Sequence, residues 1–453
     1  MQRLQPCMSQ CSRGISALVG RTGTAGVGGG HSWRFFGETQ GTGASKGSRW
    51  ARGASLSPPG RRHTLALTLM PAPADARTAL ARLSSSDATH ATHATTHENK
   101  SNKSNKRVVF LGTPEVASKV LTELFAASRA SQSGAASGTD PWEISAVVTQ
   151  PGRPKGRGKV PQPSPVYETA ISNGIPESRI FTPVKASEKD FLAALADLNP
   201  DICITAAYGN YLPTAFLSIP THGTLNIHPS LLPLYRGAAP VQRSLQDGVR
   251  TSGVTVLYTV KEMDAGPIVD QATYDVGENV TSPELLDALF RLGTERLVAC
   301  LPGVWDGRVS IGMSREQAHG EATHAGKIGR EEGRLQFRRA EMDHDKTRAF
   351  CGWPGTYGRF LMVGEDGKEE MVEVKVLETR VGESGVGKDV EEGLEARRVV
   401  LDKGKNAMVA RCADGSVLEL RRLQNPGKKP VDGKAFGNGL GGRKMYWIGD
   451  GEE

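Results

Sequence analysis

From residue 107 onward, short apolar runs alternate with segments of helical apolar spacing, and this alternation restricts the fold more than any other feature. Five runs have the length and composition of strands, at 107–112, 143–150, 201–207, 223–229 and 252–260. Segments typical of amphipathic helices separate or follow them, at 113–127, 163–174, 190–199 and 282–303. Strands alternating with helices predict an α/β domain with a Rossmann-like, doubly wound and mostly parallel sheet.

The pattern changes near residue 303. We expect the last helix to be capped by Ser282 and to end at Pro302. Residues 303–326 then have no regular apolar spacing, and we predict that they form a linker. Beyond them, short alternating runs separated by Gly and Asp turns are typical of a small β-barrel of the OB type. The sequence therefore predicts two folded domains, 107–302 and 327–453. Polar stretches near 128–140 and 380–395 are interpreted as surface insertions.

Residues 1–106 differ from the rest in charge and complexity. The chain carries a formal charge of +7, yet its first hundred residues hold 12 basic and 4 acidic side chains, and the other 353 hold 44 and 45. Such a Gly-, Ser- and Thr-rich segment buries too little apolar surface to fold, so we predict disorder. An Arg-rich, Ser-rich, acid-poor N-terminus is typical of organelle transit peptides. We expect a mitochondrial protein, with a plastid as the alternative; an unprocessed tail is the other interpretation.

Composition excludes several other classes. The six cysteines form no CxxC pair and no cluster with histidine, which indicates neither a zinc site nor a disulfide framework. No run of 18 apolar residues is present, so no transmembrane helix is expected. Gly112 follows the first strand without a GxGxxG pattern, which disfavours NAD binding.

The densest group of reactive side chains is NIHPSLLPLYRGAAP, residues 226–240, which begins as a predicted strand ends. Ligands bind at this end of open α/β sheets. Asn226 and His228 are two residues apart, so their side chains face the same side of the strand. An amide that stabilises an oxyanion and an imidazole that accepts a proton are what acyl transfer requires. Asp264 also follows a strand and would orient the imidazole. A structural histidine is the alternative interpretation.

Several longer strings identify a family. FLGTPEVA, VTQPGRPKGRGK, AAYGNYLP, NIHPSLLPLYRGAAPVQRSL, GVTVLYTVKEMDAGPI and LQNPGKKP, in this order, resemble the methionyl-tRNA formyltransferase family over about 107–436. The resemblance implies formyl transfer from 10-formyltetrahydrofolate to initiator Met-tRNA without a metal. It implies that Asn226, His228 and Asp264 are catalytic. It further implies a folate site lined by Ser230, Leu231, Leu232 and Pro233.

The acceptor is predicted from basic segments. The sequence GRPKGRGK follows a strand and carries four basic residues at alternate positions, Arg153, Lys155, Arg157 and Lys159. Basic loops suit RNA phosphates, and the family match points to Arg157. The second domain adds a segment, 397–444, with 12 basic and 4 acidic side chains. Leu234 departs from the family, which often has a basic residue there.

Two other functions stay open from the sequence. A related formyltransferase acting on a small amine, such as glycinamide ribonucleotide or an amino-sugar nucleotide, would share the Asn-x-His motif and the later aspartate. An inactive RNA-binding protein built on the same scaffold is the other alternative. The two basic segments argue against the first, and the intact catalytic residues argue against the second. We expect a monomer that does not contact a membrane.

Overall fold

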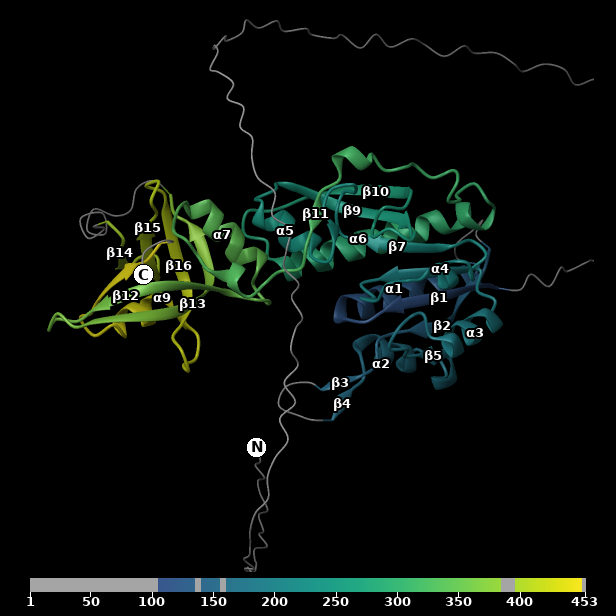
Figure 1. The fold of residues 1–453 in the computed structure, drawn as a ribbon, viewed down its shortest axis with the longest axis horizontal. Coiled ribbons are helices and arrows are strands. Elements are labelled where there is room, and N and C mark those ends of the chain that lie inside the picture. The colour runs from purple at the N-terminus through teal and green to yellow at the C-terminus, as the bar shows by residue number, and fades with distance from the viewer. Residues whose placement is uncertain (1–104, 135–139, 155–159, 384–395, 450–453) are drawn as a thin grey trace, which may run out of the picture. The chain divides into compact units, whose positions relative to one another are not determined.

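The computed structural model describes residues 105–134, 140–154, 160–383 and 396–449 (Figure 1). All but the last two residues of the predicted leader lie outside these ranges, as do Lys155, Arg157, Lys159 and most of the 380–395 stretch. Among the described residues, no helix is both long and apolar enough to cross a bilayer.

The first domain is built on one sheet of seven described strands in the order β10-β9-β7-β6-β1-β2-β5. Strands β1, β2, β5, β6 and β7 are parallel, and the two at one edge, β9 and β10, are antiparallel to their neighbours. The bounds are β1 Lys106–Gly112, β2 Trp142–Val148, β5 Ile180–Phe181, β6 Ile202–Ala206, β7 Thr224–His228, β9 Thr251–Tyr258 and β10 Ile268–Asp275. This confirms the Rossmann-like, mostly parallel fold.

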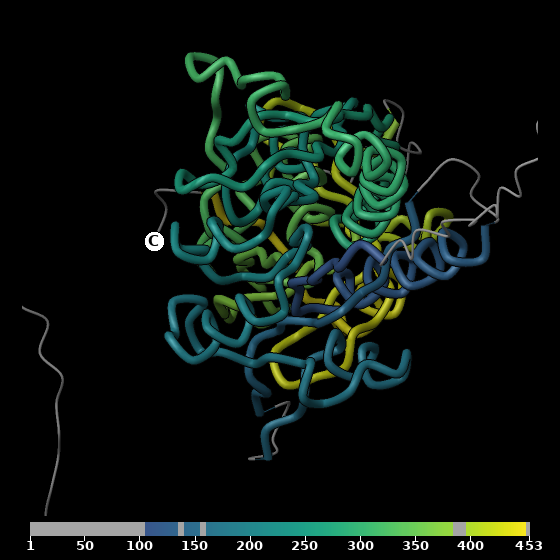
Figure 2. Tube along the Cα trace, turned by 90° about the vertical axis from the view of Figure 1, so that its right-hand side faces the viewer, coloured from purple at the N-terminus to yellow at the C-terminus, as the bar shows by residue number. Residues whose placement is uncertain are grey.

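Helices cover both faces of this sheet because successive strand residues point to opposite sides. Val108 and Phe110 of β1 pack into one apolar core, and Val109 and Leu111 pack into another. The first core includes residues of α1 Glu115–Gln132, α2 Pro165–Ser172, α5 Pro240–Gln246 and α6 Ser282–Trp305; the second includes residues of α3 Lys189–Asp197 and α4 Thr214–Leu217. Helices α1 and α6 lie side by side on the first face (Figure 2).

Two helices, α6 and α1, differ from their predicted bounds. Helix α6 is capped by Thr281, because the side chain of Glu284 accepts a hydrogen bond from the Thr281 backbone N–H at 2.9 Å and completes a capping box. The same helix continues past Pro302 to Trp305. Helix α1 extends into the stretch near 128–140, because the Ser128 hydroxyl donates to the Trp142 carbonyl at 2.9 Å and ties its last turns to β2.

Two pairs of short strands lie outside the main sheet. Strands β3 Arg153–Pro154 and β4 Pro161–Gln162 are antiparallel and flank residues 155–159. Strand β8 Arg236–Gly237 lies in the segment that follows β7, and it pairs in parallel with β11 His324–Ala325. The second pair joins the predicted linker to the first domain.

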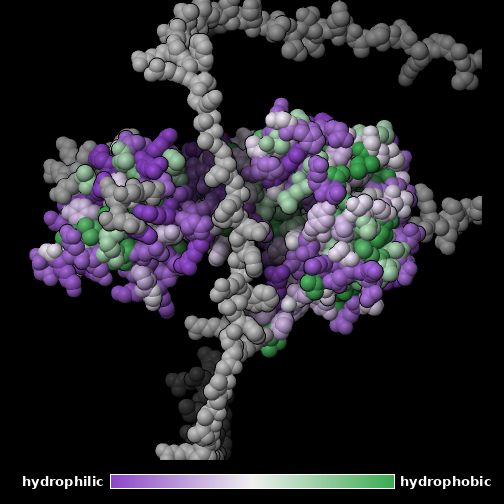
Figure 3. All heavy atoms as spheres, viewed as in Figure 1, coloured by the Kyte–Doolittle hydropathy of each residue, from purple (hydrophilic) through white to green (hydrophobic). Residues whose placement is uncertain are grey.

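The second domain is a closed antiparallel barrel. Its strand order is β13-β12-β18-β14-β15-β16-β17, and a further pairing of β13 with β16 closes a ring of six. The bounds are α7 Ala340–Ala349, β12 Thr356–Val363, β13 Glu369–Val381, β14 Arg398–Asp402, β15 Ala407–Arg411, β16 Val417–Gln424, β17 Val431–Asp432, α9 Gly433–Asn438 and β18 Lys444–Trp447. Phe337, Phe360, Leu420 and Trp447 pack inside, and hydrophilic residues cover much of the visible outer surface (Figure 3). The predicted barrel is confirmed.

Candidate active site

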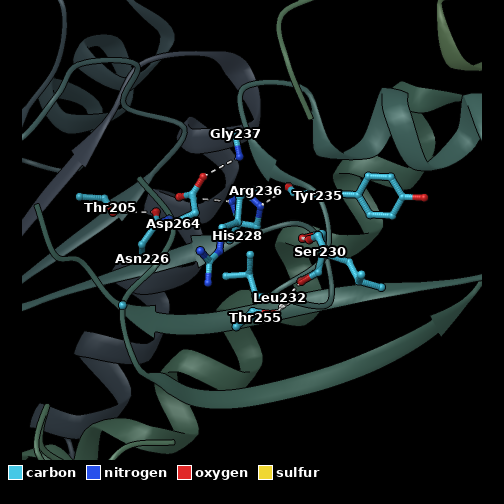
Figure 4. A network of polar contacts seen from close by, with 12 residues as sticks. Thr205, Asn226, His228, Ser230, Leu232, Tyr235, Arg236, Gly237, Thr255 and Asp264 are labelled. Atoms are coloured by element: carbon cyan, nitrogen blue, oxygen red, sulfur yellow. Dashed lines mark hydrogen bonds and ion pairs between the residues drawn. The ribbon is translucent and has the colours of Figure 1, made fainter. Parts of the chain in front are cut away.

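Strand β7 presents the predicted reactive side chains on one face of the sheet. Leu225 and Ile227 belong to the apolar core that contains α6. Asn226 and His228 alternate with them and therefore point to the opposite face, as the two-residue spacing predicts. Figure 4 shows the amide and the imidazole on the same side of the strand.

Asp264 reaches the imidazole by a route that the sequence did not indicate. Strand β9 is antiparallel to β7, so the chain leaves it beside Leu225, at the end of β7 opposite His228. Residues 259–267 then bring Asp264 back to the imidazole (Figure 4). Asp264 has a φ of 50°, a left-handed conformation that aspartate tolerates better than most residues. The site thus lies on the face of the sheet, between two loops.

The two nitrogens of the His228 ring have different neighbours. Nε2 lies 3.0 Å from the Tyr235 carbonyl oxygen, which only accepts, so Nε2 carries a hydrogen. Nδ1 faces Asp264 Oδ1 at 3.6 Å, and the two side chains are 5% and 16% exposed. Asp264 Oδ2 accepts the backbone N–H of Gly237 at 2.9 Å. With a hydrogen on Nε2, the neutral ring has its lone pair on Nδ1, the nitrogen that faces the carboxylate.

A threonine on the neighbouring strand orients the amide of Asn226. Thr205, on β6, pairs with Asn226 in the sheet, and its hydroxyl donates to Asn226 Oδ1 at 2.7 Å. The carbonyl end of the amide is thereby occupied, which leaves the Nδ2 end to act as a donor. This orientation is the one that stabilises a developing oxyanion.

Hydrogen bonds within the loop and to β9 fix the loop predicted to bind folate. The Ser230 hydroxyl donates to the Leu234 carbonyl at 2.6 Å, and Thr255 Oγ1 donates to the Ser230 carbonyl at 2.7 Å. Leu232 is only 3% exposed and packs with Leu257 of β9 and Ile268 of β10. The hydroxyl hydrogen of Ser230 and the side chain of Leu232 thus serve the loop itself, and a folate-facing role for Ser230, Leu231, Leu232 and Pro233 stays a prediction.

Tyr235 is held in place from two directions. Its hydroxyl donates to Asp247 Oδ2 at 2.9 Å. Burial is the main cause that raises the pKa of the phenol, and the hydrogen bond and negative charge of Asp247 raise it further. Its backbone N–H donates to Thr323 Oγ1 at 2.8 Å. Both contacts keep its carbonyl against His228 Nε2.

Gly237 is a position that excludes larger residues. Its φ is 122°, and a Cβ built there would lie 2.8 Å from the Ala325 carbonyl oxygen. Glycine therefore permits the backbone conformation in which the Gly237 N–H reaches Asp264.

The basic loop is described only in part. Arg153 is exposed, and its guanidinium donates to Gln150 Oε1 at 2.7 Å. Gln150 Nε2 in turn donates to the Tyr208 carbonyl at 3.1 Å. The three other basic residues of the loop lie outside the described residues.

Two protein-family models match the chain. The model described as "Formyl transferase" matches residues 106–301, and "Formyl transferase, C-terminal domain" matches residues 327–441. A methionyl-tRNA formyltransferase from Ectopseudomonas mendocina is 35% identical over 72% of this chain and 92% of its own length. One from a Sulfurihydrogenibium species is 32% identical over 72% of this chain and 94% of its own length. The chain belongs to the methionyl-tRNA formyltransferase family.

Membership of the methionyl-tRNA formyltransferase family confirms the resemblance found in the sequence. The protein is an enzyme that transfers a formyl group from formyltetrahydrofolate. A solved sugar 3N-formyl transferase, crystallised with dTDP and 5-N-formyl-THF, is 15% identical, with a TM-score of 0.47 over 72% of this chain and 99% of its own. Within the described ranges, no group of three His, Cys, Asp or Glu residues is placed to hold a metal ion.

Sequence reasoning about this formyltransferase missed the groups that hold the predicted site residues in place. Thr205 lies in the predicted strand 201–207, whose apolar pattern indicates burial and gives no sign of a polar contact. The Tyr235 carbonyl and the Gly237 N–H belong to the quoted NIHPSLLPLYRGAAP string, but backbone groups give no signal in a sequence. Only the left-handed and glycine positions of this string indicate an unusual backbone conformation, and in a sequence they predict no more than a turn.

Proposed function

We propose that this protein transfers the formyl group of 10-formyltetrahydrofolate to the amino group of methionine on initiator Met-tRNA. The observation that carries the proposal is the convergence of His228 Nδ1, the Asp264 carboxylate and an Asn226 amide whose donor end is left available. The choice of acceptor draws on the relatives, which are named methionyl-tRNA formyltransferases.

In the proposed mechanism the methionine nitrogen bonds to the formyl carbon to give a tetrahedral intermediate, and the bond from that carbon to N10 of the folate breaks when the intermediate collapses. His228 Nδ1 accepts the proton that the amine releases and returns it to N10, so that protons balance. Asp264 stabilises the imidazolium formed between these steps. Asn226 Nδ2 donates to the oxyanion of the tetrahedral intermediate. One donor of this kind lowers a barrier by about 3 kcal/mol.

The RNA part of the proposal depends on charge. Arg153 is exposed beside residues 155–159, which add Lys155, Arg157 and Lys159 to one loop. The barrel segment 397–444 has 12 basic and 4 acidic side chains, whereas the whole chain after residue 106 has 42 and 45. Local basic surfaces of this kind bind phosphates without sequence preference. We propose that the loop and the barrel bind the tRNA and that the enzyme acts as a monomer.

We propose a mitochondrial location, with a plastid as the alternative, because of the basic, acid-poor leader. A fusion of residues 1–106 to a fluorescent protein tests this. Accumulation in mitochondria is expected, accumulation in plastids would select the alternative, and a diffuse signal would contradict both.

The acceptor is tested by a formylation assay with purified full-length protein and 10-formyltetrahydrofolate. Mass spectrometry would measure formyl-methionine released from charged initiator tRNA, in parallel with glycinamide ribonucleotide and an amino-sugar nucleotide. Transfer to Met-tRNA supports the proposal. Faster transfer to either small amine would replace it with the small-amine formyltransferase, and no transfer to any acceptor would leave the inactive RNA-binding protein.

The RNA role of the loop is tested with Arg157→Ala. Removing one phosphate contact should lower kcat/KM for Met-tRNA about tenfold and reduce its dependence on salt concentration. Folate binding, measured by calorimetry, should stay unchanged. Equal losses in both measurements would contradict a role specific to RNA.

A further inference from the structure

Residues 315–325, which we call the crossing segment, lie between the two matched family regions and contact both loops of the site. Arg315 pairs with Ile268 through two backbone hydrogen bonds, of 2.7 and 3.0 Å, at the end of the loop that carries Asp264. At its other end, the crossing segment contributes β11, which pairs with β8 in the loop that follows His228. The chain predicted to be only a linker therefore joins the two loops that form the site.

Gln317 is the third residue of the crossing segment and is 3% exposed. Its Nε2 donates to two backbone carbonyls, those of Asp264 and Gly266, each at 2.8 Å. Its Oε1 accepts from Arg236 Nε at 3.0 Å and from Arg236 Nη2 at 2.5 Å. Both ends of this buried amide are thus satisfied, and Arg236 itself is 7% exposed.

The hydrogen bonds of Gln317 Nε2 reach the turn that positions Asp264. Asp264 has a left-handed φ of 50°, which is less favourable for a residue with a side chain. A Cβ at Gly266 would lie 1.8 Å from the Tyr258 carbonyl oxygen, so the turn is tightly packed. On the other loop, Arg236 directly precedes Gly237, whose N–H binds the Asp264 carboxylate at 2.9 Å. Gln317 therefore links the backbone of Asp264 to Arg236, and the next residue, Gly237, donates the hydrogen bond to the Asp264 carboxylate.

We propose that Gln317 is a positioning residue for formyl transfer, which holds the Asp264 carboxylate at its distance from His228 Nδ1. The inference rests on the proposed function, since it assumes that Asp264 serves the reaction. It also extends the catalytic unit beyond residue 301, where the matched formyl transferase region ends.

The first test compares kinetic constants of full-length variants. Gln317→Ala should lower kcat about tenfold to a hundredfold, because a small displacement of a reacting group costs this much. The KM values for folate and Met-tRNA should change less than about twofold, because substrate contacts are kept. Gln317→Glu, which keeps an acceptor for Arg236 but loses both donors, should also lower kcat. Glu316→Ala, at an exposed neighbour, is the matched control and should keep normal kcat. Unchanged kcat in both Gln317 variants would overturn the proposal.

The second test asks whether Gln317 acts through Asp264. In an Asp264→Asn background, Gln317→Ala should lower the remaining kcat by less than about twofold, because two residues of one unit are not additive. Losses that multiply would mean that Gln317 acts elsewhere, for instance on general stability.

The third test does not depend on activity. Hydrogen exchange of the Gly237 amide, followed by mass spectrometry with residue-level fragmentation, reports its bond to the Asp264 carboxylate. Exchange should be at least about tenfold faster in Gln317→Ala and in Gln317→Glu, and unchanged in Glu316→Ala. If the unaltered protein fails to formylate Met-tRNA, the proposed function is lost while this measurement still decides the positioning. If exchange at Gly237 stays unchanged, the positioning proposal is lost.

Discussion

A buried carboxylate of the barrel, Glu419, and a partly buried one of the candidate site, Asp264, have opposite surroundings. Glu419 of the barrel is 6% exposed and receives Lys405 Nζ and Arg421 Nη2, each at 2.8 Å. Asp264 is 16% exposed; one oxygen accepts the Gly237 N–H, and the other lies 3.6 Å from His228 Nδ1, beyond hydrogen-bonding length. Low exposure alone therefore does not separate the carboxylate that we propose to be catalytic from one that stabilises the barrel. The difference lies in the pairing: Glu419 shares its charge with two permanent cations, whereas the Asp264 carboxylate faces only a backbone N–H and a histidine ring.

The comparison predicts its largest effect at Asp264. Asp264→Asn keeps the shape but removes the charge that stabilises imidazolium, so kcat for Met-tRNA should fall about a hundredfold or more. The free energy of unfolding should change by less than about 1 kcal/mol, because the neutral amide still accepts the Gly237 N–H. Steady-state kinetics and urea unfolding measure the two quantities. An active variant, or a strongly destabilised one, would remove the distinction between the carboxylates.

The barrel carboxylate should give the reverse result. Glu419→Gln removes the charge that two cations share, which should lower the free energy of unfolding by about 2 kcal/mol. The kcat value should stay within about twofold, since Glu419 belongs to the barrel and its ion-pair partners, Lys405 and Arg421, are barrel residues. Glu370, 63% exposed and 3.6 Å from Arg443, is the matched control, and Glu370→Gln should cost less than about 0.5 kcal/mol. Equal stability losses in the two variants would contradict the role of burial.

The ion pairs of Glu419 also predict a pH dependence of stability. Burial opposes ionisation of Glu419, but hydrogen bonds from Lys405 and Arg421 outweigh it and lower its pKa below the ordinary 4.5. Folding therefore favours the ionised form. This stabilisation is complete above pH 4.5, the range of the unfolded chain, and is lost as the pH falls through the lowered pKa of the folded state. The difference in urea midpoint between the native protein and Glu419→Gln should shrink on acidification below that range. A constant difference would show that charge is not its cause.

Much of this architecture follows from the sequence because periodicity and motif spacing are local. Alternating strand and helix patterns predict the sheet, and the two-residue spacing of Asn226 and His228 predicts their common face. The direction of a strand in the sheet is not local. Residues 252–260 have the same apolar pattern in either direction, and their antiparallel pairing decides the route by which Asp264 returns to β7.

The groups that hold the site were not predictable for a related reason. Gln317 lies in a stretch without periodicity, and its burial depends on contacts with residues about fifty positions earlier, such as the Asp264 and Gly266 carbonyls. The cap of α6 moved by one residue to Thr281 because both Thr281 and Ser282 are good caps, and the reach of Glu284 decides between them.

The smallest predicted effect on kcat concerns Asn226, whose amide is oriented by Thr205. Thr205→Val keeps the shape of the β6 residue but removes the hydroxyl that donates to Asn226 Oδ1 at 2.7 Å. The amide would then be free to rotate, and a neutral hydrogen bond of about 1 kcal/mol corresponds to a loss of about fivefold in kcat. Thr205→Ser keeps the hydroxyl and should retain full kcat, whereas folate affinity should be unchanged in both variants. If Thr205→Val were fully active, Asn226 would be oriented by the substrate itself, and preorganisation in this site would belong to the carboxylate alone.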